Sequence, residues 1–177
     1  MTHTHVATET VTIALGVDYG QAYLFDDTSE TNIPDHLVDD DPVHPLGIIN
    51  VGDGVALLTV GTHYGRVPFD VQVAQSEPAP DLGAYEDIVE ISFASEAGSV
   101  SLHEWGDEDI HELPPLPAGP GWYRLRYHAY GLDEGHADCY EEHAPDRYLL
   151  QIWPADESGP RVVKSTSGRH RRWVQAC

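Results

Sequence analysis

The sequence predicts an all-β protein, a single-domain antiparallel β-sandwich or jelly roll with long acidic loops. Three observations predict it: apolar residues recur at every second position, Gly and Pro separate these runs, and no long amphipathic helix is evident. At 177 residues and 41% hydrophobic content, the chain is long enough to bury a core of its own. A closed barrel is the alternative architecture.

The chain divides into three parts. We expect residues 1–7 to be a disordered N-terminus, residues 8–166 to form the β-sandwich domain, and residues 167–177 to be a basic C-terminal tail. Within the domain, residues 55–60 are apolar on both faces, which is typical of a central strand. The alternating runs lie at residues 11–17, 69–73, 88–93, 100–102, 121–130 and 148–152.

The run at 121–130 has two chemically different faces. One face is apolar or aromatic and is expected in the core: Tyr123, Leu125 and Tyr127. The opposite face is amphipathic: Trp122, Arg124, Arg126 and His128. Trp and Arg are typical of binding hot spots, but arginines on a strand more commonly pair with acids of a neighbouring strand, and we expect the latter.

Turn chemistry connects the runs. The sequences Asp18-Tyr19-Gly20 and 51–54 are typical of tight turns between strands. Two long loops interrupt the strands, at residues 26–46 and 131–147, and loops of this length in a compact domain are usually functional or disordered. A single helical turn is expected near residues 35–41 or 133–143.

The negative charge is concentrated in the first two thirds of the chain. Residues 1–118 contain 22 Asp and Glu and one basic residue, Arg66, whereas residues 119–177 contain eight acids and eight bases. Such a field repels nucleic acid and anionic membranes and attracts basic proteins. Acidity also favours solubility and accompanies adaptation to salt, but we expect those effects to spread acids over the whole chain.

Ten acids of two segments, 26–46 and 104–112, are the candidate partner-binding residues. They are Asp26, Asp27, Asp35, Asp39, Asp40, Asp41, Glu104, Asp107, Glu108 and Asp109. Their expected role is to pair with Arg and Lys side chains of a basic protein.

Catalytic motifs are not evident. The sequence has no Gly-x-Ser-x-Gly elbow and no phosphate-binding glycine loop, and the segment that starts at Asp107 fails as an EF-hand because Glu112 occupies the glycine position. We therefore expect no enzymatic activity, no cofactor and no metal. The alternative is a metal- or ligand-binding jelly roll, possible as an enzyme, that uses His136, Cys139 and His143 of the 131–147 loop.

No apolar run approaches the ~20 residues that cross a bilayer, and the N-terminus lacks a basic residue followed by an apolar block. The two cysteines are too few for a disulfide framework, so a cytoplasmic, reduced protein is expected.

Residues 85–166 resemble a group of small bacterial β-proteins that are similar to the competence protein J family. The resemblance depends on the strand Pro120-Gly-Trp-Tyr-Arg-Leu-Arg126 and on the strand Tyr148-Leu-Leu-Gln-Ile-Trp-Pro154. Members of that family are linked to inhibition of a DNA-entry nuclease. The resemblance implies a nuclease inhibitor or immunity-type factor, and no functional residues are transferred because both motifs look structural.

Overall fold

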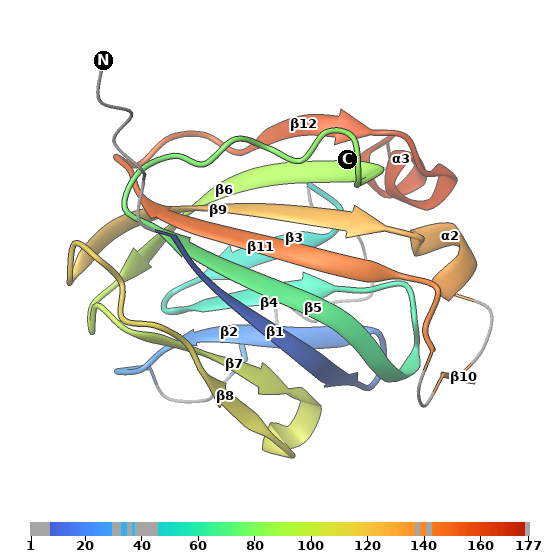
Figure 1. The fold of residues 1–177 in the computed structure, drawn as a ribbon, viewed down its shortest axis with the longest axis horizontal. Coiled ribbons are helices and arrows are strands. Elements are labelled where there is room, and N and C mark those ends of the chain that lie inside the picture. The colour runs from blue at the N-terminus through green and yellow to red at the C-terminus, as the bar shows by residue number, and fades with distance from the viewer. Residues whose placement is uncertain are drawn as a thin grey trace.

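The computed structural model describes residues 8–29, 33–34, 37, 46–136, 139–140 and 143–175. Its strands form two sheets that pack face to face, so the β-sandwich prediction is confirmed (Figure 1). None of the helices in these ranges is long and apolar enough to cross a membrane.

The larger sheet has seven strands. Its main path runs in the order β1 (Thr8–Val17), β5 (Tyr64–Ala74), β11 (Arg147–Pro154), β9 (Gly121–Tyr130), β6 (Asp87–Ser95) and β12 (Arg161–Ser165), and β10 (Cys139–Tyr140) pairs with β5 off this path. The pairs are antiparallel except that β11 and β10 run parallel to β5. The strand pattern did not predict this parallel pair, because alternation does not encode strand direction.

The smaller sheet has five strands. Its order is β3 (Ile49–Gly52), β4 (Val55–Thr59), β2 (Gln21–Asp26), β7 (Val100–Glu104) and β8 (Ile110–Glu112). As predicted from its two apolar faces, β4 is an internal strand, and its first four residues are all buried.

The core lies between the sheets and is built from the alternating positions. In β1, Ile13, Leu15 and Val17 face inward while Thr12 and Ala14 are exposed. Tyrosine and phenylalanine rings of three adjacent strands stack at its centre, with ring centroids 5.7 to 6.1 Å apart. They are Phe69, Tyr127 and Tyr148, so the expected burial of Tyr127 is confirmed, as is that of its neighbours Tyr123 and Leu125.

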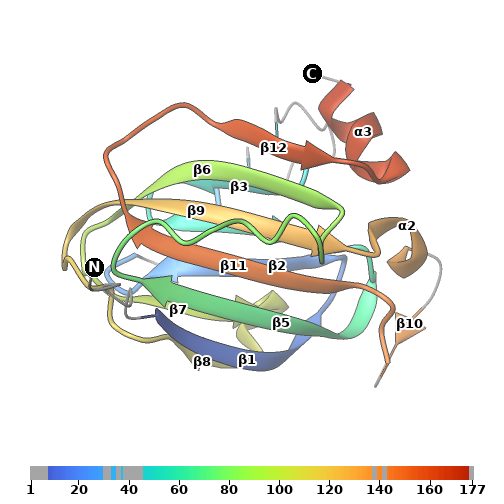
Figure 2. The same ribbon diagram turned by 45° about the horizontal axis from the view of Figure 1, so that its top comes forward.

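The outer face of the larger sheet is polar, and an extended segment at residues 75–86 crosses it (Figure 2). Here Arg126 donates to Glu90 Oε1 at 2.7 Å, and Arg124 Nε lies 3.6 Å from Glu90 Oε2. The expected pairing of the strand arginines with acids of a neighbouring strand is therefore confirmed. Arg126 also donates to the backbone oxygen of Pro78, and Gln151 to that of Ala79, which fixes the crossing segment.

Three short helical elements have bounds within the described residues. The expected helical turn in the 131–147 loop is α2 (Leu132–Gly135), and η1 (Trp105–Asp107) follows β7. Within the expected basic tail, residues 168–175 form the helix α3 (Gly168–Gln175). His170 explains why: it is fully buried, and its Nε2–H donates to the backbone oxygen of Leu46 at 2.8 Å, which anchors the helix to the sandwich.

Candidate functional site

The turn Asp18–Gly20 carries the chain from the larger sheet to the smaller one. Tyr19 and Gly20 both have positive φ, at 54° and 66°, and Tyr19 is the one such non-glycine residue among those described. A tyrosine in the left-handed region is strained, and such residues are enriched at functional sites. Its side chain is 58% exposed, and its ring centroid lies 5.2 Å from that of Trp105.

Glu104 is a carboxylate at a core-facing position. It follows the apolar residues Val100 and Leu102 at a spacing of two, so its side chain points between the sheets and is only 4% exposed. Its Oε1 accepts a 2.7 Å hydrogen bond from the backbone nitrogen of Gly16 and lies 3.2 Å from His111 Nε2. Gly16 leaves the necessary room, because a Cβ there would lie 2.5 Å from Glu104 Oε2.

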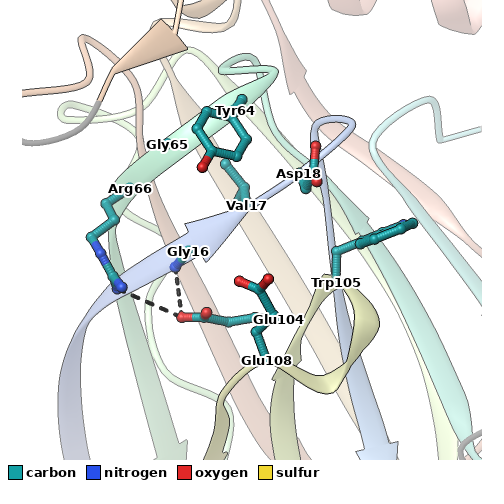
Figure 3. A pocket seen from close by; sticks show the side chains of 9 residues that line it. All are labelled: Gly16, Val17, Asp18, Tyr64, Gly65, Arg66, Glu104, Trp105 and Glu108. Atoms are coloured by element: carbon teal, nitrogen blue, oxygen red, sulfur yellow. Dashed lines mark hydrogen bonds and ion pairs between the residues drawn. The ribbon is translucent and has the colours of Figure 1, made fainter.

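These elements enclose a cleft of about 420 Å³ at one corner of the sandwich (Figure 3). We refer to this cavity as the cleft; it is lined by Gly16, Val17, Asp18, Tyr64, Gly65, Arg66, Glu104, Trp105 and Glu108. Arg66 and Trp105 lie on opposite sides of it, with the carboxylates of Glu104 and Glu108 between them.

Exposed aromatic side chains lie at the cleft. Tyr64 is 52% and Trp105 41% exposed, and Tyr19, whose ring contacts that of Trp105, is 58% exposed. Large exposed apolar residues that gather beside a concavity are typical of protein-binding surfaces. The exposed acids Glu108 and Asp109 lie between η1 and β8, and Glu108 lines the cleft, so the surface combines aromatic anchors with carboxylates.

The structure brings together part of the predicted acidic set. Glu104 and Glu108 line the cleft, and Asp109 is exposed just before β8. The backbone of Asp107 belongs to η1, and its side chain lies outside the described part of the chain. The predictions for Asp35, Asp39, Asp40 and Asp41 also fall outside the described residues.

Asp26 and Asp27 lie at the other end of the β2–β7 pair, because Asp26 is opposite Val100 whereas Glu104 is opposite Ala22. Asp27 is exposed, but Asp26 is 1% exposed. Burial acts to raise the pKa of Asp26, but hydrogen bonds from Ser95, Thr28 and the backbone of Ala97 outweigh it and lower that pKa. Asp26 therefore stays ionised to hold its own loop, and it is not a surface residue as the sequence suggested.

A second groove, of about 670 Å³, lies at this other end. Its lining includes Asp26, Asp53, Glu96, Glu157 and the half-exposed Trp122. Trp122 is the one large exposed aromatic residue in that lining, whereas Tyr19, Tyr64 and Trp105 gather at the cleft. The cleft is therefore the better candidate for a binding site.

The metal-binding alternative falls only partly on described residues. No three His, Cys, Asp or Glu side chains within the described part of the chain lie close enough to hold a metal, but the side chain of Cys139 is not among them. His136 is exposed at the end of α2. Slight burial and then the charges of Arg169 and Arg172 lower the pKa of His136, and such positive charge disfavours a bound cation.

The aromatic half of this surface was not predicted from the sequence. Two signals could have revealed it. The turn Asp18-Tyr19-Gly20 places a bulky residue where a two-residue turn requires positive φ. The spacing Val100-x-Leu102-x-Glu104 places an acid on the core-facing side at the end of a strand, which predicts a carboxylate with an internal role.

All nine Lys and Arg residues of the chain lie in the larger sheet or in α3. They are Arg66, Arg124, Arg126, Arg147, Arg161, Lys164, Arg169, Arg171 and Arg172. The strands of the smaller sheet carry none, and Asp26, Glu104 and Glu112 are their acids. The charge asymmetry along the chain is thus also an asymmetry in space.

No protein-family model matches the chain, and no curated protein matches it. Two solved structures share its fold. The protein named Crocagin biosynthetic gene J has a TM-score of 0.58 and 19% identity, over 85% of this chain and 99% of that one. ComJ from Bacillus subtilis, an inhibitor of the DNA-degrading activity of NucA, has a TM-score of 0.54 and 14% identity, over 86% and 100%. The ComJ-like fold expected from the sequence is therefore confirmed over most of the chain.

Proposed function

We propose that this protein is a non-enzymatic binding protein that occupies the basic surface of a partner, and that the partner is a nuclease whose activity it inhibits. The observation that carries the proposal is the cleft surface, where three exposed aromatic side chains (Tyr19, Tyr64 and Trp105) adjoin exposed carboxylates. Aromatic anchors supply binding energy, and complementary charge selects the partner and speeds association.

The charge layout supports the same proposal. A nuclease binds DNA through a basic groove that contacts phosphates, and a folded acidic surface competes for that groove. The strands of the smaller sheet contain no Lys or Arg, and the exposed acids Glu108, Asp109 and Glu112 lie in or next to its edge strand β8, so this edge carries negative charge that no basic residue of the same sheet offsets. The likeness to ComJ, an inhibitor of a nuclease, agrees with this proposal.

The test begins with the purified chain as bait in a lysate of its own organism, at low and high salt. A retained cationic nuclease is then purified and assayed for DNA degradation with increasing amounts of the chain. We expect inhibition that saturates at a stoichiometric ratio and weakens as salt rises. A retained nuclease that keeps full activity when saturated with the chain would contradict the proposal.

Two tryptophans provide a matched pair of variants. Trp105 at the cleft and Trp122 at the second groove are 41% and 44% exposed, so either change to alanine removes a similar exposed ring. We expect Trp105→Ala to weaken partner binding by about 30-fold, the factor of a hot-spot residue, and Trp122→Ala to leave it unchanged. Equal losses in the two variants would exclude the cleft as the binding surface.

A further inference from the structure

The cleft already contains one guanidinium group, that of Arg66. This is the one basic residue among the first 118, and its Nη1 lies 3.8 Å from Glu104 Oε1 and donates to the backbone oxygen of Ala14 at 3.0 Å. The Arg66 side chain is 52% exposed, whereas that of Glu104 is 5% exposed. A long ion pair with one solvated partner is weak, so Arg66 is readily displaced from a carboxylate that is itself fixed.

Backbone groups on the side of β1 that faces away from β5 are already hydrogen-bonded at this point. The Gly16 N–H, which points away from β5, donates to Glu104, and the Ala14 carbonyl accepts from Arg66. An added strand would need these groups for its own hydrogen bonds. The cleft is therefore suited to a side chain rather than to an added strand. Its volume of about 420 Å³ lies within the range of ~300–1,000 Å³ that is usual for ligand pockets.

The lining of the cleft matches one kind of side chain. Glu104 and Glu108 supply two carboxylates on one wall, and Asp18 adds a third carboxylate near Trp105. A planar guanidinium makes paired hydrogen bonds with carboxylates and stacks on aromatic faces, whereas an ammonium is a compact and strongly hydrated point charge. Trp105 lines the cleft and is 41% exposed, which leaves ring surface for such a group to contact.

Resting on the proposed function, we propose that the cleft is the receptor for one arginine side chain of the basic partner. Its guanidinium takes the place of Arg66 beside Glu104, pairs with Glu104 and Glu108, and lies against Trp105. Arg66 is then an internal competitor that occupies the site while the partner is absent. Arginine is chosen over lysine because the group that the cleft already holds is a guanidinium.

The experiment titrates the ¹⁵N-labelled protein with N-acetyl-arginine amide and, separately, with N-acetyl-lysine amide. The Gly16 amide and the Trp105 indole N–H are the reporters. We expect saturable shifts at both reporters, with tighter binding of the arginine probe. Arg66→Gln removes the competitor, so its affinity for the arginine probe should rise by up to about fivefold, the factor that corresponds to an exposed ion pair.

Glu108→Gln and Glu96→Gln are a matched pair, because both residues are exposed and each change removes one negative charge. We expect only Glu108→Gln to weaken binding of the arginine probe. The proposal is overturned by an absence of shifts at Gly16 and Trp105, by equal binding of the lysine probe, or by weaker binding in Arg66→Gln. A chain that binds the arginine probe but inhibits no nuclease would refute the proposed function alone. Inhibition that depends on Trp105 without binding of the probe would refute the arginine receptor alone.

Discussion

His128 provides a sharp prediction for the pH dependence of folding. It lies on the outer face of the larger sheet with its side chain fully buried. Its Nδ1–H donates to the backbone oxygen of Leu149 at 3.2 Å, and its Nε2 accepts from the backbone N–H of Asp81 at 3.2 Å. Because the second contact requires a lone pair on Nε2, only the neutral imidazole fits both partners.

The pKa shift sets the magnitude. Burial is the main cause that lowers the pKa of His128 from 6.5 to about 4, and the positive charge of Arg126 adds to it against the opposing effects of Leu149 and Asp81. The unfolded chain therefore binds a proton more readily than the folded one between these two values. The folded state keeps its full stability above pH 6.5 and loses roughly 3 kcal/mol as the pH falls to 4, at about 1.4 kcal/mol per unit.

The assay is urea unfolding of the native chain and of His128→Gln at a series of pH values from 7.5 to 4, since a Gln amide can donate to one neighbour and accept from the other without titrating. The difference in unfolding free energy between the two proteins isolates His128 from the many carboxylates, which titrate in both. We expect the unfolding free energy of the native chain, relative to that of His128→Gln, to fall by roughly 3 kcal/mol on acidification. A difference that is constant with pH would refute the reasoning.

Three further substitutions test the cleft and the ion-pair network. Tyr19→Asn relieves the strain of positive φ and should raise the unfolding free energy by about 1 kcal/mol. The loss of the ring should also weaken partner binding. A variant that is destabilised in thermal unfolding would contradict the first expectation. Gly16→Ala should cost about 1–3 kcal/mol in urea unfolding, because the new Cβ collides with Glu104; an unchanged midpoint would show that the carboxylate moves freely. Glu90→Ala leaves the buried Arg126 without its 2.7 Å partner and should lower the unfolding free energy, measured in urea, by about 3–5 kcal/mol. A loss below about 1 kcal/mol would show that Glu77 alone is enough to pair with Arg126.

The strands could be predicted from the sequence because burial imposes a period of two on them. Val11 to Val17 and Tyr123 to Tyr127 alternate visibly, and the structure buries the predicted members of both runs, with Val11 half-buried at the strand's outer end. What alternation cannot give is the assignment of a strand to a sheet. β1 and β2 are separated only by the turn Asp18–Gly20, yet they belong to different sheets.

The terminal helix was missed for a related reason. Residues 168–175 contain four Arg or His and one Trp, which as a local pattern is typical of a solvated basic tail. The helix depends on tertiary contacts that no local pattern reveals. Asp133 of α2 accepts from the backbone N–H groups of Gly168 and Arg169, and His170 donates to Leu46, 124 residues away in sequence.

The charge distribution shows most clearly what the fold adds to the sequence. A chain with acids in its first two thirds and bases in its last third could fold so that the two neutralise each other everywhere. Here the bases of β9, β11 and β12 are used within the larger sheet: Arg124 and Arg126 contact Glu90, Lys164 donates to two backbone oxygens, and Arg147 lies over the Tyr130 ring. Because these bases make their contacts there, they do not neutralise the acids of the smaller sheet, whose strands all come from residues 21–112. Topology therefore keeps the negative field on the side of the cleft, and a cationic partner approaching that side meets carboxylates and aromatic rings with Arg66 as the one guanidinium lining the entrance.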